Sequence, residues 1–409
     1  MTNLRPQSIE EMDLPLMDVL SPEFAADPVR AMRVARESGM GMAKSHRGVE
    51  LLTYHWVSSL IVDPRFHTVD AAHFQQKGAP ESMLCWARDG LLLSMEKERH
   101  DKVRLVLSRA FTLRRIDEQR ELMQTIAHRW IDTFAATGRC DFVQDFTLRY
   151  PMELLCRYVG VPVEDIPVFL GAAQDLHLLA AVPMAPGFDR IDRALNTMEA
   201  YVVDILERRR SDPQPDYLSA LIEAQRTEGE LTQSELVGNV INLLFAGAGT
   251  TKHQLASAVQ LFVETGVWDD LAREPDLVAP AIEEAMRMHP VTQFVVRIPY
   301  EDVVIGDHLF PARRRVILNL KAASRDPKAF PDPDRVDYAR AGLTRSRLPF
   351  GWGSHYCLGH AFARSSMREA VEAMTRRVTE VVLGDGAAMT PTANMLSGPE
   401  HLPLRFRPR

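Results

Sequence analysis

The stretch FGWGSHYCLGHAFAR, residues 350–364, sets a cysteine among glycines, histidines and aromatic side chains. Cys357 immediately precedes residues with helical periodicity, and the amide groups at a helix N-terminus stabilise a thiolate. Gly351 and Gly353 permit tight turns and let the backbone approach a ligand closely. A lone cysteine is more often inert core, so it is the whole stretch that favours a thiolate reaching a large flat cofactor.

A long helix is predicted over residues 233–265. Thr232 and Glu235 form a capping box at its start, and Gly266 is a plausible stop. Its middle, NLLFAGAGTT, is apolar and small, so the helix should be buried. A second helix, residues 276–288, carries Glu284 and Arg287 three residues apart on one face, a pair that by itself is most often an exposed ion pair.

The remaining pattern is mostly helical with a minor β part. Residues 50–62 and 294–317 favour strands, the latter short and separated by turns. Helical periodicity recurs over residues 98–110, 115–137, 143–159, 190–210 and about 359–380.

Composition excludes several classes of protein. The 409 residues are 46% hydrophobic and 25% charged, as in ordinary globular proteins. A net charge of −7 without a basic tract argues against nucleic-acid binding. Four irregularly spaced cysteines favour a reducing compartment. The polar start and the lack of about 18 consecutive apolar residues predict a cytoplasmic protein that does not span a membrane.

The cysteine stretch resembles the heme-binding signature of the cytochrome P450 family through Phe350, Gly351, Gly353, His355, Cys357 and Gly359, and Ala363 and Arg364 continue the match. The resemblance covers most of the chain. It implies heme b with Cys357 as the axial thiolate ligand. It also implies a mainly α fold with a small β region and a long central helix over heme. The expected organisation is a single domain, 1–409, with a helix-rich core at about 98–290 and 355–380 and β-rich parts at about 45–65 and 294–320.

Other residues match this family outside the cysteine stretch. Glu284 and Arg287 resemble its buried Glu-x-x-Arg pair, and Arg335 stands at the place of the downstream arginine, which implies a scaffold for the heme loop. The resemblance also implies contacts to the heme propionates from His100, Arg104, Arg297 and His355.

The segment Ala246 to Thr251 resembles the family's oxygen-binding segment. Small residues would let the helix pass close to heme, with a local bulge leaving room for oxygen, and Thr250, followed by Thr251, would organise proton delivery. Gly249 departs from the pattern, because the family usually has an acid there. Glycine carries no proton, so water or another acid serves, or the enzyme activates oxygen differently.

These residues together predict a monooxygenase that inserts one atom of O₂ into a small apolar organic substrate. Without a fused redox module, electrons would come from a separate ferredoxin and ferredoxin reductase. The partner would dock on a basic patch of Lys97, Arg99, Lys102, Arg109, Arg114, Arg115, His360 and Arg368.

Two other functions stay open. Gly249 leaves room for a peroxide-driven or oxidative-coupling enzyme, and a non-catalytic heme-binding sensor is the alternative of another class. The polar candidates for orienting a substrate are Thr292 and Gln293, and residues 176–188, which are apolar and interrupted by proline, are compatible with a lid.

Overall fold

A computed structural model gives the structure of the chain and describes residues 6–109, 111–229, 231–340, 343, 348–386 and 393–409. Its contacts group the chain into two compact units. The first unit comprises Met1–Val69, Glu283–Cys357 and Pro391–Ser397. The second comprises Asp70–Ile282, Leu358–Thr390 and Gly398–Arg409. Helices dominate and three small sheets accompany them among the described residues, which confirms the predicted fold class. That the whole chain forms one domain stays a prediction.

The first unit is built around a five-stranded sheet in the order β2-β3-β9-β6-β4. Its strands are β2 (Met42–Ser45), β3 (Gly48–Leu51), β9 (Val316–Asn319), β6 (Phe294–Pro299) and β4 (Phe66–His67). Strand β3 pairs in parallel with β9, with Val49 opposite Val316 and Leu51 opposite Leu318. Because alternate residues of a strand point to the same face, these four side chains enter one hydrophobic core.

A second small sheet of this unit has the order β1-β8-β7, from β1 (Gln7–Ser8), β8 (His308–Phe310) and β7 (Val303–Ile305). The helices of the unit are α1 (Pro22–Ala26), α2 (Pro28–Ser38), α3 (Tyr54–Leu60) and α16 (Leu320–Ala323). The predicted strands over residues 294–317 are confirmed by β6, β7, β8 and β9.

The prediction of a strand over residues 50–62 is wrong for most of its length. Strand β3 ends at Leu51, and α3 begins at Tyr54. The Thr53 hydroxyl accepts a hydrogen bond from the Trp56 amide at 3.3 Å and caps the helix. Capping of this kind satisfies an amide that the first helical turn leaves unpaired, so Thr53 starts a helix where the aromatic and β-branched residues favour a strand.

Most helices belong to the second unit. They are α4 (Ala71–Gln76), α5 (Glu81–Asp89), α6 (Lys97–Ser108), α7 (Leu113–Asp117), α8 (Arg120–Asp132), α9 (Tyr150–Val159), α10 (Ile166–Asp175), α11 (Phe188–Ser211), α12 (Tyr217–Glu228), α13 (Gln233–Glu264), α14 (Val267–Arg273) and α17 (His360–Arg377). The π-helix η3 (Val143–Thr147) precedes α9, and α15 (Val278–Met288) crosses the boundary of the two units. A sheet of β10 (Val378–Leu383), β11 (Pro403–Pro408) and β5 (Arg139–Asp141) completes the unit.

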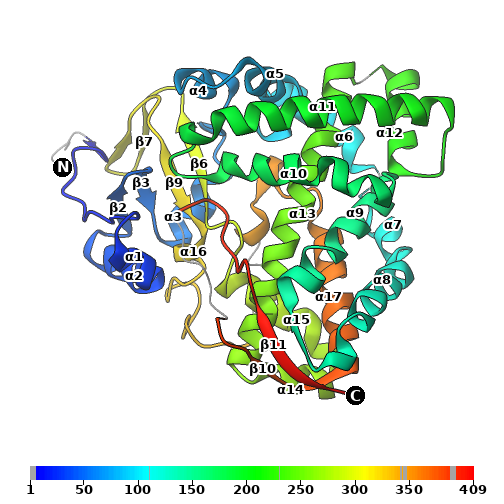
Figure 1. Cartoon of the computed structure of the whole chain (residues 1–409). Coiled ribbons are helices and arrows are strands. Elements are labelled where there is room, and N and C mark those ends of the chain that lie inside the picture. Colours follow the sequence, from blue (N-terminus) through cyan, green and yellow to red (C-terminus); the bar gives the residue numbers. More distant parts are fainter. Residues whose placement is uncertain (1–5, 110, 230, 341–342, 344–347, 387–392) are drawn as a thin grey trace. The chain divides into compact units, whose positions relative to one another are not determined.

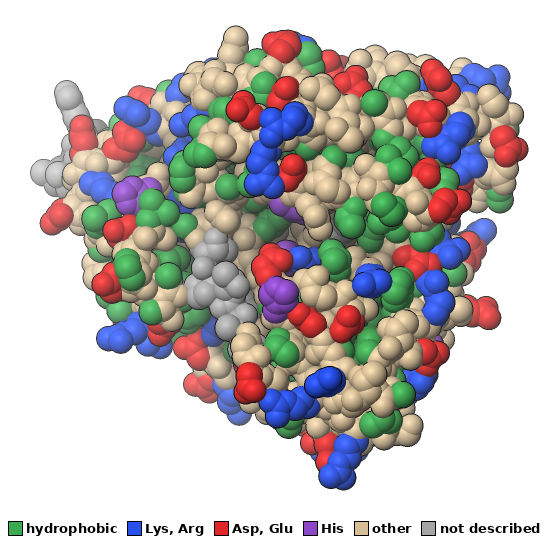
Figure 2. All heavy atoms as spheres, in the orientation of Figure 1, with side chains coloured by type: hydrophobic (Ala, Val, Ile, Leu, Met, Phe, Trp, Pro, Cys, Tyr) green, Lys and Arg blue, Asp and Glu red, His purple; other side chains and the backbone are tan. Residues whose placement is uncertain are grey.

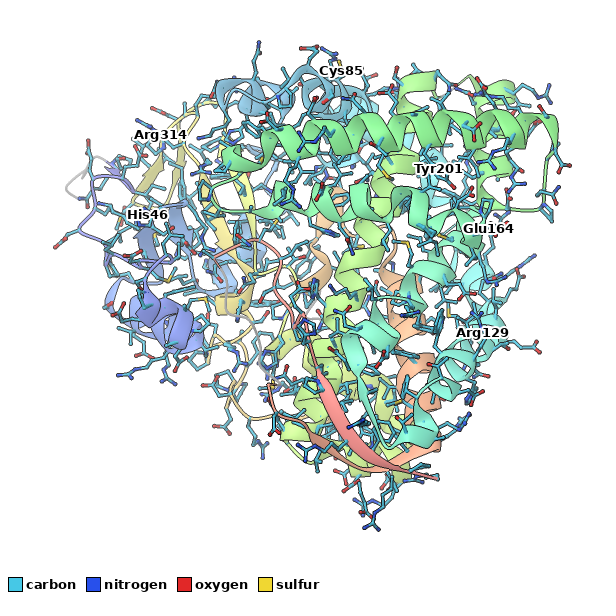
Figure 3. The ribbon with its side chains drawn as sticks, in the orientation of Figure 1. His46, Cys85, Arg129, Glu164, Tyr201 and Arg314 are labelled. Carbon is cyan, nitrogen blue, oxygen red and sulfur yellow. The ribbon has the colours of Figure 1, made fainter. Side chains whose placement is uncertain are left out.

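Helix α13 runs through the helices of this unit and packs on α5, α9, α11 and α14 (Figure 1). Thr232 and Glu235 form the predicted capping box at its start. Its contact with the end of α5 depends on glycine, because a Cβ added at Gly238 would lie 2.3 Å from the Cα of Gly90. The outer pair α10 and α11 is joined by Tyr201, which points from α11 toward α10 (Figure 3) and donates a hydrogen bond to Asp165 at 3.0 Å. Among the described residues, none of the helices combines the length and the apolar character that crossing a membrane requires.

Candidate functional site

The Cys357 loop is a series of tight turns. Two short 3₁₀ helices, η9 (Leu348–Phe350) and η10 (Gly353–His355), precede the cysteine. Gly351 and Gly353 have φ angles of 75° and 70°, in the left-handed region that favours glycine. The Cys357 amide donates to the Phe350 carbonyl at 2.9 Å, which closes the loop at the cysteine backbone. Gly359 then caps α17 at its N-terminal end.

Its exposure distinguishes Cys357 from the other three cysteines. Cys140 and Cys156 are buried, whereas Cys357 is exposed. Burial raises the pKa of the Cys156 thiol to about 12 and also raises the pKa of Cys140 and Cys85. A metal ligand must be a thiolate, so the raised pKa values make Cys85, Cys140 and Cys156 poor candidates for one.

The surroundings of Arg297 show whether its guanidinium could bind a heme propionate. The residue lies on β6 with 4% of its surface exposed. Its guanidinium donates to the carbonyls of Val296 at 3.0 Å and Ile61 at 3.3 Å, and no carboxylate of the described residues pairs with it. Burial lowers its pKa to about 10, so it remains a cation at neutral pH. A buried cation with only neutral partners fits an anionic ligand, as a propionate would be.

The other predicted propionate contacts fall in both units. His355 is half-buried in the cysteine loop of the first unit, together with Phe350 and Gly351. His100 and Arg104 lie four residues apart on α6 of the second unit and therefore share a helix face. His100 is buried and places its Nδ1 atom 2.8 Å from the Asp101 carboxylate, and burial lowers its pKa.

The predicted oxygen-side residues lie within α13. The Thr250 hydroxyl donates to the Ala246 carbonyl at 2.7 Å, and Thr251 is buried. The expectation of a local bulge is wrong, because α13 is continuous α-helix from Gln233 to Glu264. Its glycines serve close packing instead. A Cβ added at Gly247 would lie 2.9 Å from the Leu155 side chain, and one at Gly249 would lie 2.1 Å from Nε2 of His177.

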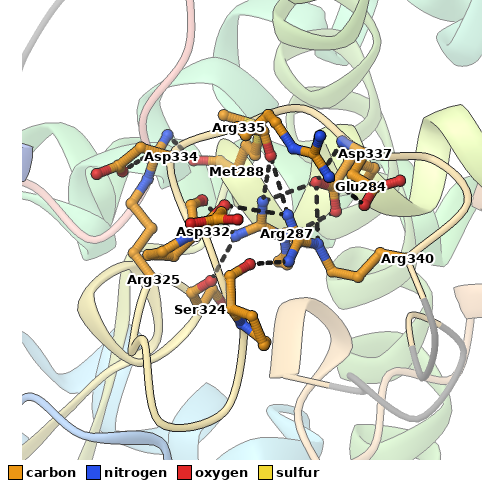
Figure 4. A network of polar contacts seen from close by, with 12 residues as sticks. Glu284, Arg287, Met288, Ser324, Arg325, Asp332, Asp334, Arg335, Asp337 and Arg340 are labelled. Carbon is orange, nitrogen blue, oxygen red and sulfur yellow. Dashed lines mark hydrogen bonds and ion pairs between the residues drawn. The ribbon is translucent and has the colours of Figure 1, made fainter.

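Glu284 and Arg287 form a fully buried pair in the first unit (Figure 4). The guanidinium makes two parallel bonds to the carboxylate, from Nε to Oε2 and from Nη2 to Oε1, both at 2.7 Å. Nη1 donates further to the carbonyls of Ser324 at 2.8 Å and Pro333 at 2.9 Å. The pair thus joins α15 to the loops after α16.

Arg335 does not take the predicted third place in this network. Its side chain is 69% exposed and pairs with Asp337, while only its backbone carbonyl faces Arg287. The side chain of Arg340 takes that place, with Nε 3.4 Å from Glu284 Oε1 and 7% of its surface exposed. Arg340 also donates to the carbonyls of Asp332 and Arg335, so the loop folds around it (Figure 4).

Gln293, a predicted substrate contact, is occupied within the protein. It is buried, its side-chain amide donates to the Asn394 carbonyl at 2.8 Å, and its side-chain oxygen accepts from Lys321 at 3.3 Å. Thr292 forms a backbone bridge with Leu396.

His177 is a residue that sequence reasoning missed, since its stretch shows no motif that places an imidazole against Gly249.

The expected basic patch is largely paired with carboxylates of the same unit. Lys97 lies 2.5 Å from Asp101, and Lys102 lies 3.0 Å from Glu98. The remaining pairs are Arg99 with Glu235, Arg114 with Glu118, and Arg368 with Glu369. Figure 2 shows the same mixing of Lys and Arg with Asp and Glu over the visible face. The patch is therefore weaker in net charge than its basic residues alone indicate.

The chain is similar to one family model and to several known proteins. The family model described as cytochrome P450 matches residues 267–382. The mycinamicin IV hydroxylase/epoxidase of Micromonospora griseorubida is 33% identical, over 77% of this chain and 79% of the relative. The vitamin D(3) 25-hydroxylase of Pseudonocardia autotrophica is 30% identical, over 94% of this chain and 92% of the relative.

A solved cytochrome P450 of Mycobacterium smegmatis, in the ligand-free state, superimposes with a TM-score of 0.84 at 27% identity. The alignment covers 95% of this chain and 98% of that one. The chain therefore belongs to the cytochrome P450 family of heme-thiolate proteins, in which a cysteine is the axial ligand of the iron, and it is a monooxygenase.

Proposed function

We propose that Cys357 is the axial thiolate ligand and that the protein inserts one oxygen atom into a small apolar substrate, with electrons from a separate ferredoxin and ferredoxin reductase. The observation that carries the proposal is the Cys357 loop. It combines an exposed cysteine with two left-handed glycines and a hydrogen bond that fixes the cysteine backbone.

Several of the predicted residues would hold heme. Cys357 would supply the sulfur, and Arg297, with only neutral partners among the described residues, would pair with a propionate. His355, His100 and Arg104 are the further candidates for the propionates, and Phe350, Gly351 and Gly359 would shape the loop beside the ring. When bound, heme supplies the oxygen chemistry, which thiolate ligation favours by donating electron density to iron.

Thr250 would handle the proton on the oxygen side. Its hydroxyl donates to the Ala246 carbonyl, so the oxygen lone pairs remain available to accept from water. The hydroxyl would therefore accept a hydrogen bond from a water and hold that water in place, because its own proton is donated to the carbonyl. Ala246, Gly249 and Thr251 would keep this part of α13 compact.

Support for the electron partner comes from a groove in the second unit. The groove has a volume of about 1540 Å³, and seven arginines line it against three acidic residues. The arginines are Arg109, Arg114, Arg115, Arg157, Arg209, Arg210 and Arg226. Such an excess of positive charge would attract an acidic ferredoxin, because complementary charge speeds association. The substrate class is supported by the two relatives, which are named for hydroxylating small organic molecules.

A peroxide-driven or oxidative-coupling reaction is the second candidate, and Gly249 is the observation that favours it. The experiment supplies the purified holoenzyme with NADH, ferredoxin and ferredoxin reductase, or with hydrogen peroxide alone. Product formation that requires NADH and the redox proteins supports the proposed monooxygenation. Turnover with peroxide at the same rate, and none with the redox proteins, would replace it with the second candidate.

A further inference from the structure

His177 occupies the space that a side chain at position 249 would need. It lies in η5 (Leu176–Ala180) and packs beside Phe245 of α13, with ring centroids 5.1 Å apart. A Cβ added at Gly249 would lie 2.1 Å from Nε2 and 2.3 Å from Cε1 of His177. The ring therefore lies against the turn of α13 that carries Thr250. Glycine is required at 249 because an imidazole fills the place of its side chain.

The Nε2 atom of His177 is buried and has no hydrogen-bond partner among the described residues. Leaving a buried polar atom unpaired costs about 1–3 kcal/mol, so water or a functional role usually accounts for it. The imidazole also forms a hydrogen bond with the backbone of Gln174. The unpaired nitrogen is thus the atom of this ring that is available for a proton.

A cavity of about 310 Å³ lies beside this ring, entirely within the second unit. The charged residues, histidines and glycine that line it are His177, Gly249, Lys252, His253 and Glu400. The other lining residues are Leu148, Met152, Leu170, Ala173 and Gln174. One water occupies about 30 Å³ of liquid, so several waters fit. The cavity holds enough polar groups to bind them.

The cavity is connected to solvent at Glu400, which lies in its lining. The Glu400 side chain is 61% exposed, and its carboxylate lies 2.9 Å from Lys252 Nζ and 3.6 Å from His253 Nε2. His253 Nδ1 is 3.2 Å from the Pro399 carbonyl. Close approach of this segment depends on Gly398, because a Cβ there would lie 2.4 Å from His253 Cβ. Glu400, His253 and His177 thus line one cavity, and the Glu400 end of it is exposed to solvent.

We propose that His177 replaces the acid that is absent at Gly249, and that protons pass from Glu400 and His253 through cavity water and His177 to the turn of α13 that carries Thr250. This inference rests on the proposed function, because Thr250 is the expected receiver. In the relay, Glu400 gives a proton to His253, His253 gives one to cavity water, and that water gives one to Nε2 of His177. The His177 imidazolium then gives a proton to water at Thr250. The ring returns to its neutral form, and Glu400 is reprotonated by solvent. No electron moves, so the relay leaves the oxidation state of every residue unchanged.

The charges around His177 suit this role. Burial chiefly, with His253 and Lys252, lowers the pKa of His177 to about 4, while the Gln174 backbone and Glu400 oppose the shift. The ring is therefore neutral at pH 7 and has a proton affinity close to that of an ordinary carboxyl group, whose pKa is about 4. Both protonate only transiently at neutral pH.

Position 249 and His177 permit a reciprocal test in the holoenzyme. His177→Gln should lower the product formed per NADH consumed by roughly tenfold or more and raise peroxide correspondingly, since a positioned proton donor contributes about 10²–10⁴-fold. Gly249→Asp alone should lower the melting temperature, because its Cβ meets the imidazole. The double variant His177→Ala with Gly249→Asp has room for the new carboxylate and should recover the product-to-NADH ratio. His128→Gln on α8, outside the cavity, is the matched control and should change neither quantity.

A spectroscopic readout independent of turnover is the titration of histidine side chains by NMR in the diamagnetic ferrous carbonyl form. The His177 signal should titrate near pH 4. His253→Gln should move that pKa upward, because it removes a positive neighbour, and Glu400→Gln should move it downward. Retained coupling in His177→Gln, with coupling lost in Thr250→Ala, would overturn the relay while leaving the proposed function intact. A His177 pKa that neither neighbour shifts would overturn the relay as well. If the unmodified enzyme made no product from NADH and substrate, the proposed function would fail and the relay with it.

Discussion

Replacing Arg287 by alanine removes the cation from a buried carboxylate. Glu284 would keep the Asp337 amide at 2.9 Å and Arg340 at 3.4 Å but lose two bonds of 2.7 Å, and the Ser324 and Pro333 carbonyls would each lose a donor. Breaking one partner of a buried pair costs roughly 3–5 kcal/mol. An unfolding entropy of about 2.1 cal/mol/K per residue corresponds to about 0.9 kcal/mol/K for this chain, so the melting temperature should fall by about 3–6 °C for cooperative unfolding.

The assay is thermal unfolding of the holoenzyme, together with the heme bound per protein after purification. Arg335→Ala is the matched control, because the same residue type is removed from an exposed pair that contributes at most about 1 kcal/mol. The loss of melting temperature in Arg340→Ala should lie between those of Arg287→Ala and Arg335→Ala, since the Arg340 side chain is buried but lies farther from Glu284. Equal losses for Arg287→Ala and Arg335→Ala, or full stability and heme content in Arg287→Ala, would refute the assignment of the network.

Three further predictions concern heme, acid and the electron partner. Arg297→Ala should lower heme content and Arg297→Lys should restore part of it, measured by heme absorbance per protein, and full occupancy in both would contradict a propionate contact. Burial opposes ionisation of Glu153, but hydrogen bonds from Arg157 and Arg129 outweigh it and lower its pKa. The stability it provides is present above its unfolded pKa and is lost as pH falls through the folded pKa, so the melting difference between the unmodified protein and Glu153→Gln should shrink in acid. Arg109→Glu should raise the apparent KM for ferredoxin at low salt more than at high salt, and unchanged kinetics at both would remove the groove as the docking surface.

The sequence predicts those elements whose signals are local. The capping box at Thr232 and Glu235 marks the start of α13, and the spacing of Glu284 and Arg287 puts the pair on one helix face. The prediction of a strand over residues 50–62 is wrong because their aromatic and β-branched residues favour a strand, while the cap supplied by Thr53 starts a helix.

Contacts between distant segments leave no such local signal. Arg335 and Arg340 belong to the same loop, and its backbone conformation decides which guanidinium returns to Glu284. The glycine at 249 is visible in the sequence as a departure from the family pattern. Its cause, the imidazole of His177, lies in η5 and emerges only when that segment packs on α13.

The most direct test of the account is the spectrum of the reduced carbonyl adduct of the purified holoenzyme and of its cysteine variants. The adduct should show the strongly red-shifted Soret band of thiolate-ligated iron. Cys357→Ala should lose that band, whereas Cys85→Ala should retain it, because the Cys85 thiol has a raised pKa and lies in α5. A red-shifted band that survives in Cys357→Ala and disappears in Cys85→Ala would contradict the assignment of Cys357 as the axial ligand.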